Sequence, residues 1–452
     1  MPRKSSIYEC QNCGSETSQY FGRCSICGEW NSLIEKEQSP RKRNQKSNQK
    51  KAGQIKSKNI AAINNFNNER FSSGFKEFDR VLGGGFIKGS IILVGGNPGI
   101  GKSTLLLQTA DKISKKQKVL YVTAEESLHQ VKIRWSRLKS NNLELNLLAE
   151  TELSEITQEI ELLKPELIII DSIQTIFDSE ISSSPGSISQ VRDCAATLNQ
   201  IAKSNEITLL IIGHVTKEGN IAGPKTLEHL VDVVLTFEGE EFASHRILRS
   251  IKNRYGATHE LGIFEMDEKG LNEVKSPSSF FINREECIGL TTTITAEGSR
   301  PFAIDIQSLT NETYYPNPRR ITTGVSINRL HQILAVIEKK LNLKLSKHDC
   351  YLSAAGGFCI NDPAADLAIA MAIISSFTNK KVQESCVVIG EIGLSGQIRP
   401  TNKIQTRLEE SKRLGFKKAI IPLTKKEKTL MNDLEVFEAD NINVAMEIAF
   451  GN

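Results

Sequence analysis

The sequence predicts an α/β protein in which a mostly parallel sheet carries a nucleotide phosphate-binding loop, with a small cysteine module before it and an α+β domain after it. Three observations support this prediction. The segment Gly96–Ser103 fits the pattern G-x-x-x-x-G-K-[ST] between a strand-like run and a helical one. Apolar runs alternate with helical patterns, and two C-x-x-C pairs stand near the start. A chain of 452 residues is too long for one core, so two or three domains are expected.

The four-cysteine module spans residues 7–34. The pairs Cys10-x-x-Cys13 and Cys24-x-x-Cys27 are separated by ten residues, and four thiolates favour tetrahedral Zn²⁺ in a closed structural site. So short a segment needs a metal of this kind to fold. A redox dithiol is the alternative, but the segment lacks the strand–helix scaffold of that site. The other five cysteines are scattered, and we expect them to be buried or inert thiols.

A basic linker is expected over residues 35–58, which are rich in Lys, Asn, Gln and Ser. Between Lys36 and Lys58 nine basic residues and one acid give a local charge of +8, whereas the whole chain carries +4. The linker therefore adds salt-sensitive attraction to a polyanion. No apolar stretch is long enough to span a bilayer and no secretory leader is recognisable, so we expect a cytoplasmic protein without a membrane partner.

Residues 59–275 show the pattern of a parallel sheet covered by helices on both faces. Two later runs, Arg246–Lys252 and Leu261–Met266, are closely spaced and are expected to be antiparallel. Ligands of such sheets bind at the carboxyl ends of the strands. The expected parallel strands are Ile91–Val94, Val119–Thr123, Leu145–Ala149, Leu167–Ile170, Leu209–Ile212 and Val233–Phe237.

The phosphate-binding loop is expected to hold ATP with Mg²⁺. Its glycines let backbone N–H groups surround the phosphates, and the helix N-terminus adds positive potential. Lys102 is expected to reach the β- and γ-phosphates, and the Ser103 hydroxyl to ligate Mg²⁺. The residues assigned to nucleotide binding here are Gly96, Asn97, Pro98, Gly99, Ile100, Gly101, Lys102, Ser103 and Thr104.

Carboxylates and a histidine follow three further strands. Asp171 ends the run Leu167–Ile170 and is expected to hold Mg²⁺, with an ordinary helix cap as the alternative. Glu125 is expected to orient the attacking water, although Glu126 stands beside it and either acid also suits a helix start. His214 is either a γ-phosphate sensor or an ordinary hydrogen-bonding residue.

The order of these parts, together with Lys252-Asn253-Arg254-Tyr255-Gly256, resembles the bacterial RadA (Sms) family of DNA repair proteins. That family's signature is K-N-R-F-G, and Tyr255 keeps an aromatic ring at the Phe position. The resemblance implies a RecA-like ATPase core in a hexameric ring. It also implies branch migration on single-stranded and branched DNA, with RecA recombinase as a partner. By the same comparison, Lys252 and Arg254 reach the neighbouring subunit's nucleotide as catalytic cations.

Residues 280–452 resemble the Lon protease domain, an α+β fold. The serine position of the D-G-P-S-A-G segment is Ala364 here, and the lysine position falls on Gln405. Acyl transfer lacks both its nucleophile and its base, so we expect this domain to be proteolytically inactive and to serve ring assembly and DNA contact. An ATP-dependent protease and a stand-alone recombinase remain the alternative functions, and an autokinase is more distant.

DNA contacts are expected in two places. The loop after His214 contributes Lys217 and Lys225, and Arg319 with Arg320 follows the turn Tyr314–Pro318. Grooves that track single strands combine cations with aromatic stacking surfaces. The alternative for each pair is a solvated surface.

Overall fold

The computed structural model of the chain describes residues 7–10, 15–17, 19–25, 28–36, 70–138, 140, 142–215, 221–222, 225–239, 245–258, 260–276, 278–283, 287–298, 300–424 and 433–451. The chain folds into two compact units. The first comprises Met1–Phe237, Arg249–Gly256 and Asp267–Leu271, and the second comprises Glu238–Leu248, Ala257–Met266 and Asn272–Asn452. The expected domain bounds stay predictions, and the expected linker lies outside the described residues beyond Lys36.

The N-terminal module is a small three-stranded antiparallel sheet. Strand β1 (Ile7–Cys10) pairs with β2 (Glu16–Thr17) on one side and with β3 (Leu33–Lys36) on the other. Its apolar core is minimal, because among its described residues the buried hydrophobic side chains are Cys10, Cys24 and Leu33, with Tyr8 packed against them. A ribbon this small gains little from apolar burial and depends on another source of stability.

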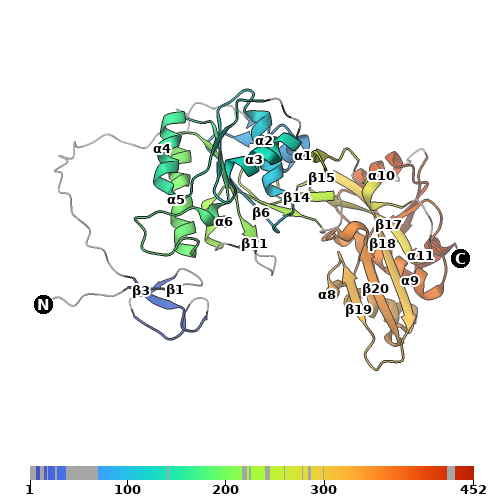
Figure 1. Cartoon of the computed structure of the whole chain (residues 1–452). Helices are drawn as coiled ribbons and strands as arrows, with labels where there is room; N and C mark the ends of the chain where they lie inside the picture. The colour runs from blue at the N-terminus through green and yellow to red at the C-terminus, as the bar shows by residue number, and fades with distance from the viewer. Residues whose placement is uncertain are drawn as a thin grey trace, which may run out of the picture. The chain divides into compact units, whose positions relative to one another are not determined.

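The first unit contains the expected parallel sheet (Figure 1). Parallel pairing runs in the order β8-β7-β9-β10-β6-β13, and the strand order continues through β14, β15 and β16. Each predicted strand is present within two residues at either end. The strands are β6 (Ile91–Gly96), β7 (Val119–Thr123), β8 (Asn146–Leu148), β9 (Leu167–Asp171), β10 (Thr208–Ile212), β13 (Val233–Glu238), β14 (His245–Asn253), β15 (Leu261–Asp267) and β16 (Gly270–Glu273).

Helices cover both faces of this sheet. Helices α4 (Leu153–Leu163) and α5 (Ile188–Ser204) pack against one set of alternating strand residues, including Leu93 and Ile170. Helix α2 (Lys102–Ile113) lies on the opposite face with α3 (Leu128–Arg137) (Figure 1). Smaller elements are α1 (Lys76–Leu82), α6 (Lys225–Leu230), the 3-10 turn η2 (Ile173–Thr175), and the short pairs β4–β5 (Arg70–Phe71, Phe86–Ile87) and β11–β12 (His214–Val215, Ile221–Ala222).

The second unit is built on a seven-stranded mixed sheet in the order β19-β20-β18-β17-β21-β24-β25. Helices α8 (Ile327–Leu341), α9 (Asp366–Thr378) and α11 (Ile442–Phe450) bury one face, and α10 (Ile404–Arg413) covers part of the other. The strands are β17 (Leu290–Glu297), β18 (Arg300–Glu312), β19 (Arg320–Thr323), β20 (His348–Ala354), β21 (Cys386–Val388), β24 (Lys418–Pro422) and β25 (Glu435–Ala439). Within the described parts of the chain, no helix combines the length and hydropathy that crossing a bilayer requires.

Candidate nucleotide-binding and catalytic site

The phosphate-binding loop connects β6 to α2 with three glycines at positive φ. Gly96, Gly99 and Gly101 have φ of 152°, 75° and 112°. A Cβ on Gly96 would lie 2.5 Å from the carbonyl oxygen of Phe237, whereas a Cβ on Gly99 would meet nothing within 4 Å. The first glycine is therefore required by the neighbouring strand β13, and the second by its left-handed backbone.

Lys102 is the first residue of α2 and points back across the loop. Its ammonium donates hydrogen bonds to the carbonyls of Gly96 at 2.8 Å and Asn97 at 2.9 Å. Burial lowers the pKa of Lys102, while the negative charges of Asp171 and Glu125 oppose that shift. The loop thus contains a buried cation with two carboxylates near it. Ser103 and Thr104 follow in the first turn of the same helix.

Asp171 ends β9 beside the loop and is oriented by a buried tyrosine. Strand β7 pairs with β9 so that Thr123 lies opposite Asp171. The Tyr121 hydroxyl donates to Asp171 Oδ2 at 2.6 Å. Tyr121 is fully buried, and burial followed by the charge of Asp171 raises its pKa well above the usual value. The peptide bond between Asp171 and Ser172 is cis. Sequence reasoning missed Tyr121, because it lies in the middle of an apolar strand run.

The two glutamates after β7 have different partners. Ser172 Oγ donates to Glu125 Oε1, and Glu125 remains exposed to solvent. Glu126 instead forms an ion pair with Arg134 of α3. The Glu126 carboxylate is therefore held by Arg134. The Glu125 carboxylate lies beside Asp171, and its negative charge acts on Lys102.

Lys252 and Arg254 lie at the edge of the sheet where the parallel strands begin, opposite the edge that carries the phosphate-binding loop. The Lys252 ammonium donates to the carbonyls of Glu228 at 2.6 Å and Val231 at 2.9 Å, so it caps the end of α6. Arg254 pairs with Asp232 at 2.9 Å. Burial lowers the pKa of Lys252, and the nearby charge of Arg254 acts in the same direction.

The position of Asp232 shows how far Lys252 and Arg254 lie from the phosphate-binding loop of their own chain. It is 1% exposed, and its Oδ2 accepts the backbone N–H of Ile91, the first residue of β6. The loop begins at the other end of that strand, five residues on, which is roughly 16 Å away. Lys252 and Arg254 are therefore far from the nucleotide loop of their own chain. Asp232 was not predicted from the sequence, where it resembles any acid before a strand.

The other members of the Lys252–Gly256 segment have internal roles. The Asn253 amide donates to the carbonyl of Leu82 at 3.2 Å, which caps the end of α1. A Cβ on Gly256 would lie 3.1 Å from the Cα of Gly83. The segment thus joins the ends of two helices to the edge of the sheet, and sequence reasoning did not predict these capping contacts.

Two of the four predicted metal ligands are described. Cys10 and Cys24 are 1% and 3% exposed, and each donates its backbone N–H at 2.9 Å to a carbonyl five residues on, that of Ser15 and Glu29. The sulfur atoms lie 3.2 Å from Ser32 Oγ and Ser15 Oγ respectively. The two cysteines thus lie in matching turns, and each buried sulfur contacts a serine hydroxyl. This arrangement fits a metal site with thiolate ligands. Cys13 and Cys27 lie outside the described residues, so the described part alone contains no three-ligand cluster.

The predicted DNA-contacting residues are only partly visible. Lys217 lies outside the described residues, and of Lys225 and His214 only the backbone is described, at the starts of α6 and β11. Arg319 is exposed, with its guanidinium carbon 5.5 Å from the ring centroid of Tyr315. Arg320 donates to the carbonyl of Leu345 at 2.8 Å and also to that of His348.

The protease positions of the second unit do not form a catalytic pair. Ala364 is 1% exposed, in the 3-10 turn Pro363–Ala365. Gln405 is on the exposed side of α10 and donates to Glu409 Oε1 at 3.3 Å. The buried cation of this helix is Arg407, which pairs with Asp362 at 2.6 Å.

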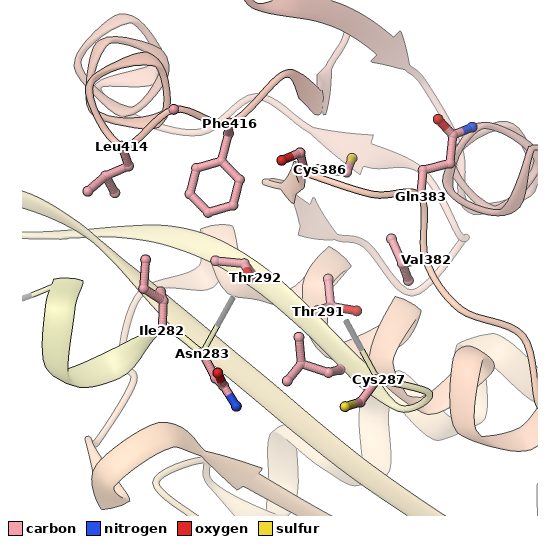
Figure 2. A pocket seen from close by; sticks show the side chains of 13 residues that line it. Ile282, Asn283, Cys287, Thr291, Thr292, Val382, Gln383, Cys386, Leu414 and Phe416 are labelled. Carbon is pink, nitrogen blue, oxygen red and sulfur yellow. The ribbon is translucent and has the colours of Figure 1, made fainter. Parts of the chain in front are cut away.

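A pocket of the second unit collects none of the predicted site residues (Figure 2). Thr291 and Thr292 of β17 line it on one side, with Cys386 and Phe416 opposite. Burial raises the pKa of Cys386 to about 12, so this thiol is a poor nucleophile at neutral pH.

The glycine loop, the buried lysine and the strand-end carboxylates define a P-loop ATPase with a RecA-like α/β core, flanked by a zinc-ribbon-like module and a Lon-like α+β domain. The comparisons with known proteins agree. Residues 66–220 match a family described as AAA domain, and residues 8–35 match a rubredoxin metal binding domain. Residues 333–425 match subunit ChlI of Mg-chelatase.

Relatives over the full length identify the family. The chain is 48% identical to DNA repair protein RadA of Synechocystis sp., covering 93% of this chain and 90% of that protein. It is 43% identical to the Bacillus subtilis protein of the same name, with 100% of both covered. A solved KaiC-like protein from Pyrococcus horikoshii aligns over 45% of this chain and 98% of its own, with 19% identity and a TM-score of 0.39. The chain belongs to the RadA family of DNA repair proteins.

Proposed function

We propose that the chain is a DNA-stimulated ATP hydrolase of recombinational repair, which works as a hexameric ring and drives branch migration on single-stranded and branched DNA beside RecA recombinase. The supporting observation is the division of the site between two sheet edges. The phosphate-binding loop, Asp171 and Glu125 lie at one edge, and the cations Lys252 and Arg254 lie at the other. A nucleotide surrounded by the loop, both carboxylates and both cations then requires groups from two chains.

The first edge supplies the nucleotide-binding and water-activating groups. Lys102 binds the β- and γ-phosphates after exchanging the two loop carbonyls for phosphate oxygens. Ser103 and Asp171 are oxygen donors of the type Mg²⁺ prefers, and the ion supplies charge neutralisation at the phosphates. Glu125, which is held by Ser172, orients the attacking water. Glu126 is already paired with Arg134, which favours Glu125 for this role.

The second edge completes the site of the next subunit. Ring closure by a head-to-tail interface places one edge of a subunit against the opposite edge of its neighbour. Arg254 is half exposed, with side-chain exposure of 50%, although it pairs with Asp232. Its guanidinium and the Lys252 ammonium are then able to stabilise charge at the neighbour's phosphates.

The remaining parts support this motor. Cys10, Cys13, Cys24 and Cys27 hold Zn²⁺ in a structural site that stabilises the ribbon. Lys217, Lys225, Arg319 and Arg320 contact DNA phosphates. The second unit serves assembly and DNA contact without proteolysis, because Ala364 offers no nucleophile.

The test is ATP hydrolysis by the full chain with and without single-stranded DNA, at low and moderate salt. We expect strong stimulation that weakens as salt rises, and no hydrolysis by Lys102→Ala. A rate of ATP hydrolysis that does not change with DNA would contradict the DNA motor and would favour a protein substrate. Strand exchange without added RecA would instead identify a stand-alone recombinase.

A further inference from the structure

The connection between β18 and β19 presents two tyrosine rings to solvent. Tyr314 is 97% exposed and Tyr315 is 67% exposed. Pro316 and Pro318 restrict the backbone of the same connection. Tyrosine rings bury a large area when they pack in a protein. Two rings left in water on a stiff turn are therefore available to stack on a planar partner at a low entropic cost.

A cation is already placed against one of these rings. The Arg319 guanidinium carbon lies 5.5 Å from the centroid of Tyr315, within cation–π range. The backbone N–H of Arg319 donates to Asp349 Oδ1 at 2.7 Å, which fixes the start of β19. Among the described residues the Arg319 guanidinium has no carboxylate partner. Its positive charge is therefore available to a ligand that stacks on the ring.

Other cations flank the tip. The Arg320 guanidinium bonds backbone carbonyls, so no acid neutralises it in the described structure. The Thr313 N–H donates to the Lys347 carbonyl at 2.9 Å, which places the exposed Lys347 beside the connection. Exposed Lys344 lies one turn earlier. Segments 312–320 and 344–349 together carry four basic and two acidic residues, a charge of +2 that suits a polyanion.

The exposed face of the adjoining sheet continues this surface. Leu309, Tyr351 and Ile321 are aligned across β18, β20 and β19 by the strand register. Leu309 is 62% exposed and Ile321 is 51% exposed. The next row holds hydrogen-bonding side chains at the paired positions Gln307, Ser353 and Thr323. The surface thus has an apolar row between a cationic aromatic tip and a polar row.

We propose that this surface, the tyrosine platform formed by Tyr314, Tyr315, Arg319 and the Leu309–Tyr351–Ile321 row, binds single-stranded DNA by base stacking. The proposal rests on the proposed function and assigns the second unit's strand-contact site. From Asn311 to Gln307 the sheet extends about 14 Å, enough for two or three nucleotides. Exposed bases stack on the rings and the apolar row, and the cations hold the phosphates. A duplex offers no free base faces, so the platform prefers single strands.

Photocrosslinking to the full chain tests the platform directly. The probe is a short oligothymidylate with one thymine replaced by 5-iodouracil, whose crosslinks form with stacked aromatic rings. We expect a crosslinked peptide that contains Tyr314 and Tyr315. The double variant Tyr314→Ser/Tyr315→Ser is expected to lose that crosslink and to bind the probe about tenfold more weakly. The matched control Tyr314→Phe/Tyr315→Phe keeps the rings and is expected to retain both.

Three outcomes would overturn the platform. One is crosslinking confined to the first unit, and another is a serine variant that binds as well as the parent. The third is a serine variant with unchanged DNA binding but altered self-association, which would make the tip a contact between copies. If ATP hydrolysis still responds to DNA in these cases, the proposed function stands while the platform fails. Absence of any DNA binding would contradict both the platform and the proposed function.

Discussion

The hydrogen bond from Tyr121 to Asp171 gives the sharpest single-atom test of the nucleotide site. Tyr121→Phe deletes one hydroxyl and leaves the ring in its fully buried place on β7. The lost bond is 2.6 Å long and its acceptor is a carboxylate, so the free energy of unfolding is expected to fall by about 1.5–3 kcal/mol. The carboxylate of Asp171 also loses the group that orients it toward the phosphate-binding loop.

The effect on catalysis is expected to appear in the Mg²⁺ dependence. Loss of a partner behind a metal-binding group weakens metal affinity by about 10–100-fold, so half-maximal ATP hydrolysis should need about tenfold more Mg²⁺. The matched control is Tyr255→Phe, which deletes a hydroxyl at the other sheet edge, where burial and the charge of Asp232 raise the pKa of Tyr255. We expect its Mg²⁺ dependence to match the parent. An unchanged Mg²⁺ requirement in Tyr121→Phe would refute the role given to Asp171 and its tyrosine.

The same substitution changes the pH dependence of stability. The pKa of Tyr121 is raised in the folded chain, so above pH ~10 the unfolded state releases a proton that the native state keeps. The tyrosine's stabilising contribution is present below that pH and is lost as pH rises. Tyr121→Phe lacks this group, and its unfolding free energy is expected to fall less steeply between neutral and strongly alkaline pH. Parallel curves for the two proteins would contradict the buried, proton-retaining tyrosine.

The remaining predictions concern the glycine loop, the thiols and the metal. Gly96→Ala, whose Cβ meets a backbone oxygen at 2.5 Å, is expected to lose about 1–3 kcal/mol in urea unfolding and to lose ATP binding. Gly99→Ala is expected to cost about 1 kcal/mol, from the left-handed backbone alone, so equal losses would contradict the packing argument. Contrary to the expectation that the scattered cysteines are buried or inert, Cys287 is exposed. At pH 8 iodoacetamide should label Cys287 and spare buried Cys386, whose pKa is about 12; mass spectrometry of the peptides decides. Cys24→Ala should release zinc while Cys287→Ala retains it, and elemental analysis with unchanged metal would reject the thiolate site.

Much of the first unit was predictable because parallel strands buried on both faces are continuous apolar runs. Val119–Thr123 was predicted with its observed bounds, and β9 gained only Asp171 at its end. The position of Asp171 beside the loop followed from the rule that ligands bind at carboxyl ends. These signals are local in the sequence, so they can be interpreted without knowledge of the strand order.

The rest depends on interactions between distant residues. The choice between Glu125 and Glu126 depends on Arg134, which takes one of them into an ion pair from the next helix. The bond between Tyr121 and Asp171 joins residues 50 positions apart, and no pattern within either strand indicates it. Lys252 and Arg254 were predicted as cations for a neighbour, but their distance from the loop of their own chain required the strand order and the position of Asp232.

The most direct test of the divided site mixes two inactive chains. Lys102→Ala lacks a working phosphate-binding loop but keeps Arg254, and Arg254→Ala has the reverse defect. Differently tagged chains show by co-purification that mixed assemblies form, and unfolding curves show that each variant is folded. If one chain completes its neighbour's site, an equal mixture should regain about a quarter of the parent's ATP hydrolysis, since working pairs meet at random. Mixed assemblies that remain inactive would contradict the account.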